Sequence, residues 1–263
     1  MKFGCCTSLW DDTLLSLPAA GADYGEASFS SLADKSFDQV KARAKELKSA
    51  GVALEAMNVL FPGNLPLTGP KADFSQVDRY LEENLPKAAL LGVKTLVFGS
   101  GGSRRVPEGF SQEEAFRQLV EVCREHIAPP VERAGMVCCV EPLCRGECNI
   151  LNTTEEVGKL VREVNRTGLK LLVDLYHFHR QGEAYEDLLP NGAWIGHLHI
   201  ASVQNDRHIP LPGDGEDYRG FFSLLHQLGY QGRLSLEGQI TGGIPQISQS
   251  LTYLRQLAQE ADL

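Results

Sequence analysis

Residues 136–143 read Met136-Val-Cys-Cys-Val-Glu-Pro-Leu143, a short apolar run that ends in an acidic residue and a proline. A run of this length and composition is typical of a buried strand in a parallel sheet. On both sides lie longer stretches with apolar residues at helical spacing, over residues 112–134 and 153–165. The segment therefore predicts a strand between two helices, which is the repeating unit of α/β proteins.

The same unit recurs along the whole chain. Further strand candidates cover residues 3–8, 23–28, 53–58, 94–99, 169–175, 195–201 and 233–238, and further helices are expected over 37–49, 74–91, near 184–189, 219–228 and 244–260. Eight strands that alternate with helices, with no linker or change in composition, favour one α/β domain over residues 1–263, folded as a (β/α)8 TIM barrel. An open doubly wound sheet is the alternative, because strand number alone does not close a barrel.

Composition narrows the possible partners. The formal net charge of −9 opposes binding to a phosphate backbone, so nucleic acid is not expected as a partner. No window approaches the roughly 18 apolar residues of a membrane span, and the first residues lack the apolar core of a signal peptide. Seven cysteines, with two adjacent pairs in apolar runs, indicate core packing in a reducing compartment. We therefore expect a cytoplasmic protein.

The last four strand candidates each end in a residue that can bind a divalent cation. These residues are Glu141, Asp174, His199 and Glu237. Strand ends that are neighbours around a barrel converge at one mouth, so three carboxylates and one imidazole should meet there. This donor set suits Mn²⁺, Mg²⁺, Co²⁺ or Zn²⁺, and a shared cation would offset the cost of burying the carboxylates. The sequence predicts one divalent metal ion, with Mn²⁺ as the first candidate.

Each position also has a simpler interpretation. A single acidic residue after a strand often caps a helix or accepts a loop hydrogen bond, and only the succession of four favours a metal. His197 lies two residues before His199 and shares its face of the strand, so it competes for the ligand position. The histidine that does not bind the metal would support the other or pack in the core.

Several motifs in the second half of the chain match a known family. They are Glu141-Pro-Leu-Cys-Arg-Gly-Glu-Cys-Asn-Ile-Leu-Asn-Thr153, Asp174-Leu-Tyr-His177, Gly196-His-Leu-His199 and the strand-end Glu237. Through them the chain resembles the xylose isomerase-like barrel superfamily, and within it the sugar phosphate isomerase/epimerase group that includes the D-tagatose and D-psicose 3-epimerases. The resemblance runs through nearly the whole chain and is sharpest from Glu141 onward.

The resemblance implies roles for individual residues. It assigns the metal to Glu141, Asp174, His199 and Glu237, and contacts with the substrate oxygens to Glu147, His177 and Arg207. It makes Glu141 and Glu237 the catalytic pair, one on each face of the carbon that loses and regains a proton. In the epimerases the arginine follows the metal-binding histidine by about six residues, whereas Arg207 follows His199 by eight. This insertion leaves His208 and Gln204 as alternatives to Arg207, and a substrate other than a free ketohexose remains open.

The same chemistry follows from the residue types. A cation chelated by a carbonyl and an adjacent hydroxyl stabilises an enediolate and makes the neighbouring C–H acidic enough for a carboxylate base. Two carboxylates on opposite faces permit epimerisation, one base permits a 1,2-proton shift, and a drier site permits a hydride shift. The sequence therefore predicts a metal-dependent isomerase or epimerase that acts on a small ketose, sugar phosphate or related hydroxy-ketone. The resemblance to the family further implies a homo-oligomer.

Other functions remain as alternatives. A lyase of the inosose or 3-dehydroshikimate dehydratase type would use the same ligands, and a sugar-binding or assembly barrel would use none of them catalytically. An endonuclease IV-like repair enzyme would need more metal ligands and a basic face, which this chain lacks.

Residues outside the strand ends carry weaker signals. Arg104 and Arg105 could hold a phosphate, although a solvated loop is the simpler interpretation. Trp10 and Phe61 could pack on a sugar, although aromatic residues in loops more often serve plain packing. The long loops over 59–73, 100–110 and 202–218 are expected to wall the pocket.

Overall fold

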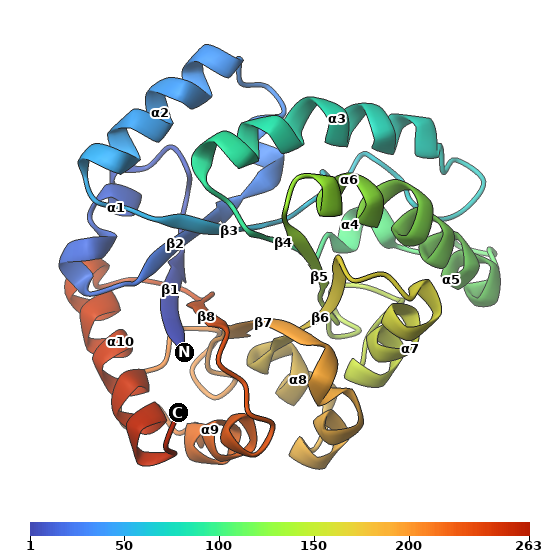
Figure 1. Cartoon of the computed structure of the whole chain (residues 1–263). Coiled ribbons are helices and arrows are strands. Elements are labelled where there is room, and N and C mark those ends of the chain that lie inside the picture. The colour runs from blue at the N-terminus through green and yellow to red at the C-terminus, as the bar shows by residue number, and fades with distance from the viewer.

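Eight parallel strands close into a barrel in the order β1 to β8 in the computed structural model, which describes residues 1–263 (Figure 1). The strands are β1 (Lys2–Cys6), β2 (Tyr24–Ser28), β3 (Leu54–Asn58), β4 (Thr95–Phe98), β5 (Val137–Val140), β6 (Leu169–Asp174), β7 (Ile195–Ile200) and β8 (Arg233–Leu236). Each strand pairs with its neighbour in sequence, and β8 pairs with β1 to close the barrel. The open-sheet alternative is thereby excluded.

The helices form a ring around the strands (Figure 1). They are α1 (Asp12–Leu15), α2 (Phe37–Ser49), α3 (Phe74–Leu91), α4 (Gly101–Arg104), α5 (Gln112–Glu121), α6 (Ala128–Arg133), α7 (Thr154–Val164), α8 (Leu175–Gln181), α9 (Tyr218–Gln227) and α10 (Gly243–Glu260). Short 3₁₀ turns cover Leu17–Ala20, Phe29–Leu32 and Tyr185–Trp194, and a π-helical turn over Val122–Ile127 joins α5 to α6. No helix is both long enough and apolar enough to cross a membrane.

The predicted element order is confirmed, and the differences are local. All eight strand candidates form strands, and α2 and α3 have the predicted bounds. The single helix expected over 112–134 is interrupted by the π-helical turn. The short helices α1, α4 and α8 were not predicted, since each has at most seven residues and shows no helical repeat.

The core has an outer and an inner part because strand residues alternate between the two faces of the barrel wall. The main hydrophobic cluster fills the space between strands and helices, and Cys138 belongs to it. Cys139, the next residue, belongs to a small separate cluster with Val97 and Leu172. Both cysteines are therefore buried in the core, on opposite faces of the strand, as predicted.

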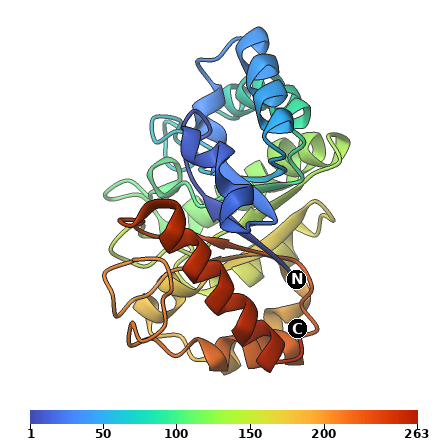
Figure 2. The ribbon, with the colours of Figure 1, turned by 90° about the vertical axis from the view of Figure 1, so that its left-hand side faces the viewer.

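The strand directions place chemistry at one end of the barrel. In parallel strands all carboxyl ends lie at the same mouth, and the long loops after β3, β4 and β7 start there. Figure 2 shows these loops on the side of the barrel away from the two termini. The residues that follow β5 to β8 therefore meet at this mouth.

Candidate metal centre

Four consecutive strands deliver the four predicted ligands to the mouth of the barrel. Glu141 follows β5, and its N–H donates to the carbonyl of Phe98 at 3.2 Å, while Glu237 follows β8 and donates to Ile200 at 3.1 Å. Asp174 is the last residue of β6 and pairs in register with His199 of β7. These backbone hydrogen bonds continue the sheet pairing by one residue, so the ligands sit on rigid strand ends rather than on loops.

The four side chains converge. One ligand atom from each of Glu141, Asp174, His199 and Glu237 lies within 4.8 Å of the others. His199 Nδ1 is 3.6 Å from Glu141 Oε1 and 3.3 Å from Glu237 Oε2. The predicted convergence is therefore present in the structure.

Three buried atoms in this cluster have no hydrogen-bond partner, namely Glu141 Oε1, Asp174 Oδ2 and His199 Nδ1. The three residues are at most 4% exposed. Buried polar atoms are almost always paired, and unpaired ones that face a common point need an explanation. A divalent cation would satisfy all three, and three carboxylates with one imidazole are donors that such a cation accepts. The residues fit a metal.

The two candidate histidines are now distinguished. His199 lies two residues closer to the mouth than His197, and its Nδ1 faces the carboxylates. His197 is fully buried deeper in the barrel, where its Nε2 lies 2.8 Å from Glu26 Oε2. His199 is the histidine of the cluster, and His197 packs beneath it.

Two carboxyl groups of the cluster have pKa values shifted in opposite directions. Burial raises the pKa of Asp174 to about 7, and the charges of Glu237 and Glu141 act in the same direction. Burial also acts to raise the pKa of Glu237, but the charges of His199 and Arg207 outweigh it and lower this pKa to about 2. Near neutral pH Glu237 is therefore ionised, while Asp174 is poised to lose its proton.

The structure places Arg207 at the centre despite the longer loop. Its guanidinium donates to Glu147 Oε1 at 3.0 Å and to Glu237 Oε2 at 3.2 Å, and it lies 3.8 Å from Asp174. Asp206 and Arg207 both have positive φ values, 46° and 57°, so the loop bends back toward the barrel at this point.

The two alternatives to Arg207 bond elsewhere. The imidazole of His208 lies 2.8 Å from the Asn205 carbonyl, and the backbone of Gln204 donates to Glu216. Neither side chain forms a hydrogen bond or ion pair with the four predicted ligands.

Glu147 and His177 lie beside the same cluster. His177 is buried, and its Nε2 lies 3.8 Å from both Asp174 Oδ2 and Glu147 Oε2 without a hydrogen bond. The backbone N–H of Cys144 donates to His177 Nδ1 at 3.3 Å, so Nε2 carries the ring proton when the imidazole is neutral. Glu147, His177 and Arg207, which the resemblance assigns to substrate contacts, thus line one side of the centre. Arg207 and His177 supply the donor groups.

Arg104 differs from the sequence interpretation. It is fully buried rather than solvated, and its guanidinium donates to the carbonyls of Phe98 and Glu141 at 3.0 and 2.6 Å. It braces the turn that carries Glu141 and is not free to hold a phosphate. Phe61 is also fully buried and packs against Phe98, so it has no face free for a sugar.

Two residues of the site were missed by the sequence analysis. Glu26 in the middle of β2 bonds both histidines of β7, and Asn58 of β3 donates to Glu237 Oε1 at 3.0 Å. Glu26 carried a weak signal, because it is an acidic residue within the strand candidate over residues 23–28. Unlike the four predicted ligands, it lies inside its strand and not at the carboxyl end.

Comparisons with known proteins agree with this architecture. The family described as xylose isomerase-like TIM barrel matches residues 17–257. A putative hydroxypyruvate isomerase of Xenopus laevis is 30% identical over 164 residues, which are 60% of this chain and 58% of that protein. The chain spans about half the length of the curated relatives it matches.

Solved structures share the fold over nearly the full length. D-psicose 3-epimerase of Clostridium cellulolyticum H10, crystallised with D-tagatose, superposes with a TM-score of 0.83 at 19% identity, covering 98% of this chain and 99% of that one. The IOLI protein, crystallised with a zinc atom, gives a TM-score of 0.74 at 21% identity and covers 99% of both chains.

Proposed function

The chain belongs to the xylose isomerase-like TIM barrel family, and on that premise we propose that it is a metal-dependent isomerase or epimerase of a small ketose or related hydroxy-ketone. The observation that carries the proposal is the set of unpaired buried atoms on Glu141, Asp174 and His199, which face one point together with Glu237. Burying these groups without a ligand would be costly, and binding a cation relieves that cost.

Glu141, Asp174, His199 and Glu237 would hold the metal. Mn²⁺ is the first candidate because three of the four donors are carboxylates, although Zn²⁺, Co²⁺ and Mg²⁺ accept the same set. When bound, a divalent cation supplies Lewis-acid polarisation of a carbonyl and its neighbouring hydroxyl, which acidifies the C–H between them. A zinc atom in the similarly folded IOLI protein supports a cation in this family.

Glu237 is the proposed base. The charges of His199 and Arg207 outweigh its burial and hold its pKa near 2, so it is ionised at neutral pH and can accept a proton from carbon. Its two oxygens are held by Asn58 and Arg207, which fix the direction of the carboxylate. Glu141 approaches from β5, separated from β8 by two strands, and would return a proton to the other face of the carbon.

Arg207, His177 and Glu147 would orient the substrate. Arg207 offers charged N–H donors and His177 offers the N–H at Nε2, and both face the centre. Such donors suit the hydroxyl and carbonyl oxygens of a sugar and would hold the reacting carbon near Glu237. Glu147 is bonded to Arg207 and can accept from a substrate hydroxyl.

The substrate class follows from what the relatives have in common. The names of the similar proteins include a hydroxypyruvate isomerase and D-psicose 3-epimerases, whose substrates share a ketone beside a carbon that bears a hydroxyl. This shared group is what a cation with one base on each side would require. We therefore place the substrate of this chain among small hydroxy-ketones, including ketoses and their phosphates.

The proposal is tested by a screen of ketohexoses, ketopentoses, their phosphates, hydroxypyruvate and inososes with Mn²⁺ in D₂O. Turnover with metal-dependent deuterium uptake next to the carbonyl is expected, together with its loss in Glu237→Gln. Glu108→Gln, which changes an exposed glutamate on the loop after β4, serves as the matched control and should behave as the wild type.

Other outcomes would redirect or remove the proposal. Turnover without deuterium uptake would replace proton transfer by a hydride shift, and release of water would identify a lyase. No turnover of any hydroxy-ketone with any of the four metals would contradict the proposed function.

A further inference from the structure

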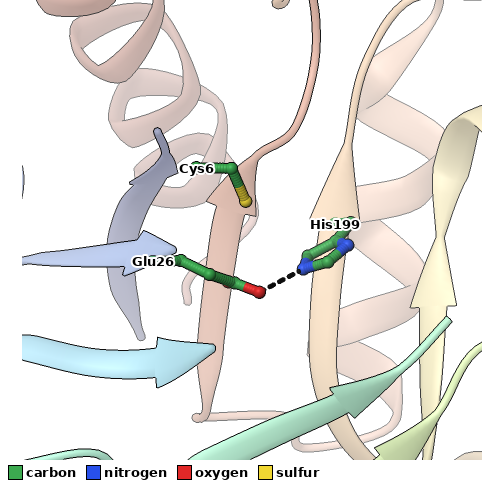
Figure 3. Close-up of side chains that lie close together, drawn as sticks. All are labelled: Cys6, Glu26 and His199. Carbon is green, nitrogen blue, oxygen red and sulfur yellow. Dashed lines mark hydrogen bonds and ion pairs between the residues drawn. The ribbon is translucent and has the colours of Figure 1, made fainter. Parts of the chain in front are cut away.

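Glu26 is a fully buried carboxylate inside the barrel, and both of its oxygens are engaged. Oε1 lies 2.9 Å from His199 Nε2, and Oε2 lies 2.8 Å from His197 Nε2. Ser235 adds a third donor, since its hydroxyl donates to Oε2 at 2.6 Å. Figure 3 shows the carboxylate reaching from β2 across the interior to the ring of His199 on β7.

Glu26 could be interpreted as a ligand of a second cation. The Cys6 sulfur points toward the Glu26–His199 pair (Figure 3), and one atom from each of the three residues lies within 4.8 Å of the others. However, this cluster leaves no carboxylate oxygen unpaired, unlike the centre formed by Glu141, Asp174 and Glu237. Burial and the charge of Glu26 also raise the pKa of Cys6 well above its ordinary value, so the thiol remains protonated. The cluster lacks the features of a metal site.

A supporting role fits the same contacts. A neutral imidazole carries its proton on one nitrogen and offers a lone pair on the other, and a hydrogen bond to the first determines which nitrogen can bind a cation. Glu26 accepts at Nε2 of His199, so a proton is held there, and Nδ1, which faces Glu141 and Glu237, is the nitrogen left to bind a cation. A carboxylate behind the ring also makes the imidazole a stronger donor to a metal.

The carboxylate is itself held in place. Its three donors come from β7 and β8, whereas Glu26 belongs to β2, so the hydrogen bonds span the interior of the barrel. The hydroxyls of Tyr24 and Ser235 are 2.7 Å apart, which fixes the serine in turn. Rotating the Glu26 carboxylate or the His199 ring would break at least one buried hydrogen bond and leave its donor unpaired, which is unfavourable in the barrel interior.

We propose that Glu26 is a positioning residue of the metal centre, which holds the proton of His199 on Nε2 and directs Nδ1 to the cation. The inference rests on the proposed function in that the cation is the one held by the four strand-end ligands.

Two substitutions of Glu26 separate its position from its charge. Glu26→Gln keeps the shape but replaces one acceptor oxygen with an NH₂ group, and Glu26→Asp keeps the charge but withdraws the carboxylate by about 1.5 Å, one C–C bond. Both should weaken Mn²⁺ binding about 10- to 100-fold, measured on metal-free protein by competition with a chelator. The matched control is Glu55→Gln on β3, whose carboxylate pairs with Lys2 and Arg233 at the opposite mouth, and it should keep wild-type affinity.

A second readout requires neither activity nor a variant. Long-range ¹H–¹⁵N spectra of the histidine rings should show an exchange-protected proton on Nε2 of His199, both in the metal-free wild type and after loading with diamagnetic Zn²⁺. A Zn²⁺-loaded spectrum with the proton on Nδ1 and a bare Nε2 would overturn the proposal even if neither Glu26 variant folds.

The outcomes separate this inference from the proposed function. Wild-type Mn²⁺ affinity in Glu26→Gln would overturn the positioning role while the proposed function stands. Wild-type affinity in Glu26→Asp alone would show that only charge matters, which also overturns it. A wild-type protein that binds Mn²⁺ but turns over no hydroxy-ketone would contradict the proposed function, and the Glu26 variants would still decide the positioning role by affinity.

Discussion

Replacing Asp174 with asparagine is expected to stabilise the metal-free protein. Asp174 is 2% exposed, and its Oδ1 accepts the N–H of Tyr176 at 2.8 Å, which caps α8. Asparagine is an equally good cap, so this hydrogen bond is retained. The other oxygen, Oδ2, has no hydrogen-bond partner and faces the carboxylates of Glu141 and Glu237. An amide group there removes a buried charge and supplies donors to both neighbours.

The size of the effect follows from the raised pKa of Asp174. Burial moves this pKa from 3.8 to about 7, and a difference of about 3 pH units corresponds to about 4 kcal/mol. Between these two values the folded protein keeps the proton while the unfolded chain loses it, so the free energy of unfolding falls as the pH rises. This decrease in the free energy of unfolding is complete above pH 7. Arg207 lies 3.8 Å away and partly compensates the charge of Asp174. We therefore expect the difference in free energy of unfolding between Asp174→Asn and the wild type to be about 1–4 kcal/mol larger at pH 8 than at pH 4, in favour of the variant.

Urea denaturation in EDTA at pH 4, 6 and 8 measures this gain, with the exposed Asp38→Asn as the control. Added Mn²⁺ at 100 times its Kd should stabilise the wild type by about 2.7 kcal/mol and leave Asp174→Asn unchanged. The reasoning is refuted if metal-free Asp174→Asn is less stable than the wild type at pH 8, or if the two proteins respond identically to pH.

Three further perturbations test the geometry of the centre. A Cβ at Gly99 would overlap the Glu141 carboxylate, so Gly99→Ala should weaken Mn²⁺ binding at least about tenfold in a chelator competition. The control is Gly146→Ala, whose added Cβ meets nothing within 4 Å and which should keep wild-type affinity. Equal affinities of the two variants would contradict the placement of Glu141. Because protonated Asp174 must lose its proton to bind a cation, the affinity for Mn²⁺ should decrease as the pH falls below about 7. Calorimetry should show protons released to the buffer on binding. An affinity that does not change between pH 5.5 and 8 would argue against this. Arg207→Ala removes a positive charge 3.8 Å from Asp174, so KM for the substrate should rise while Mn²⁺ affinity is unchanged or higher; weaker Mn²⁺ binding would be inconsistent with the structure.

The barrel and the convergence of the four candidate ligands could be predicted because the relevant signals are local. Glu141, Asp174, His199 and Glu237 each end an apolar run, and parallel strands bring such ends to one mouth without further information. The choice of His199 over His197 came from the resemblance to the family, because the two residues share a face of the strand. In the structure His199 pairs in register with Asp174 at the mouth of the barrel.

The remaining features depend on contacts that no local pattern contains. Glu26 is on β2, and its role appears only when the closed barrel brings it within 2.9 Å of a histidine on β7. Arg104 lies in a glycine-rich, polar segment typical of an exposed loop, yet the carbonyls of Phe98 and Glu141 bury its guanidinium. The helix that follows Asp174 has only seven residues, too few to show a helical repeat. Its bounds depend on the cap that Asp174 provides.

Crystals grown with Mn²⁺ provide the most direct test of the centre. Anomalous difference density is expected as one peak bound by Glu141, Asp174, Glu237 and the Nδ1 atom of His199. A peak at another cluster, or none at a Mn²⁺ concentration that saturates binding in solution, would contradict the account.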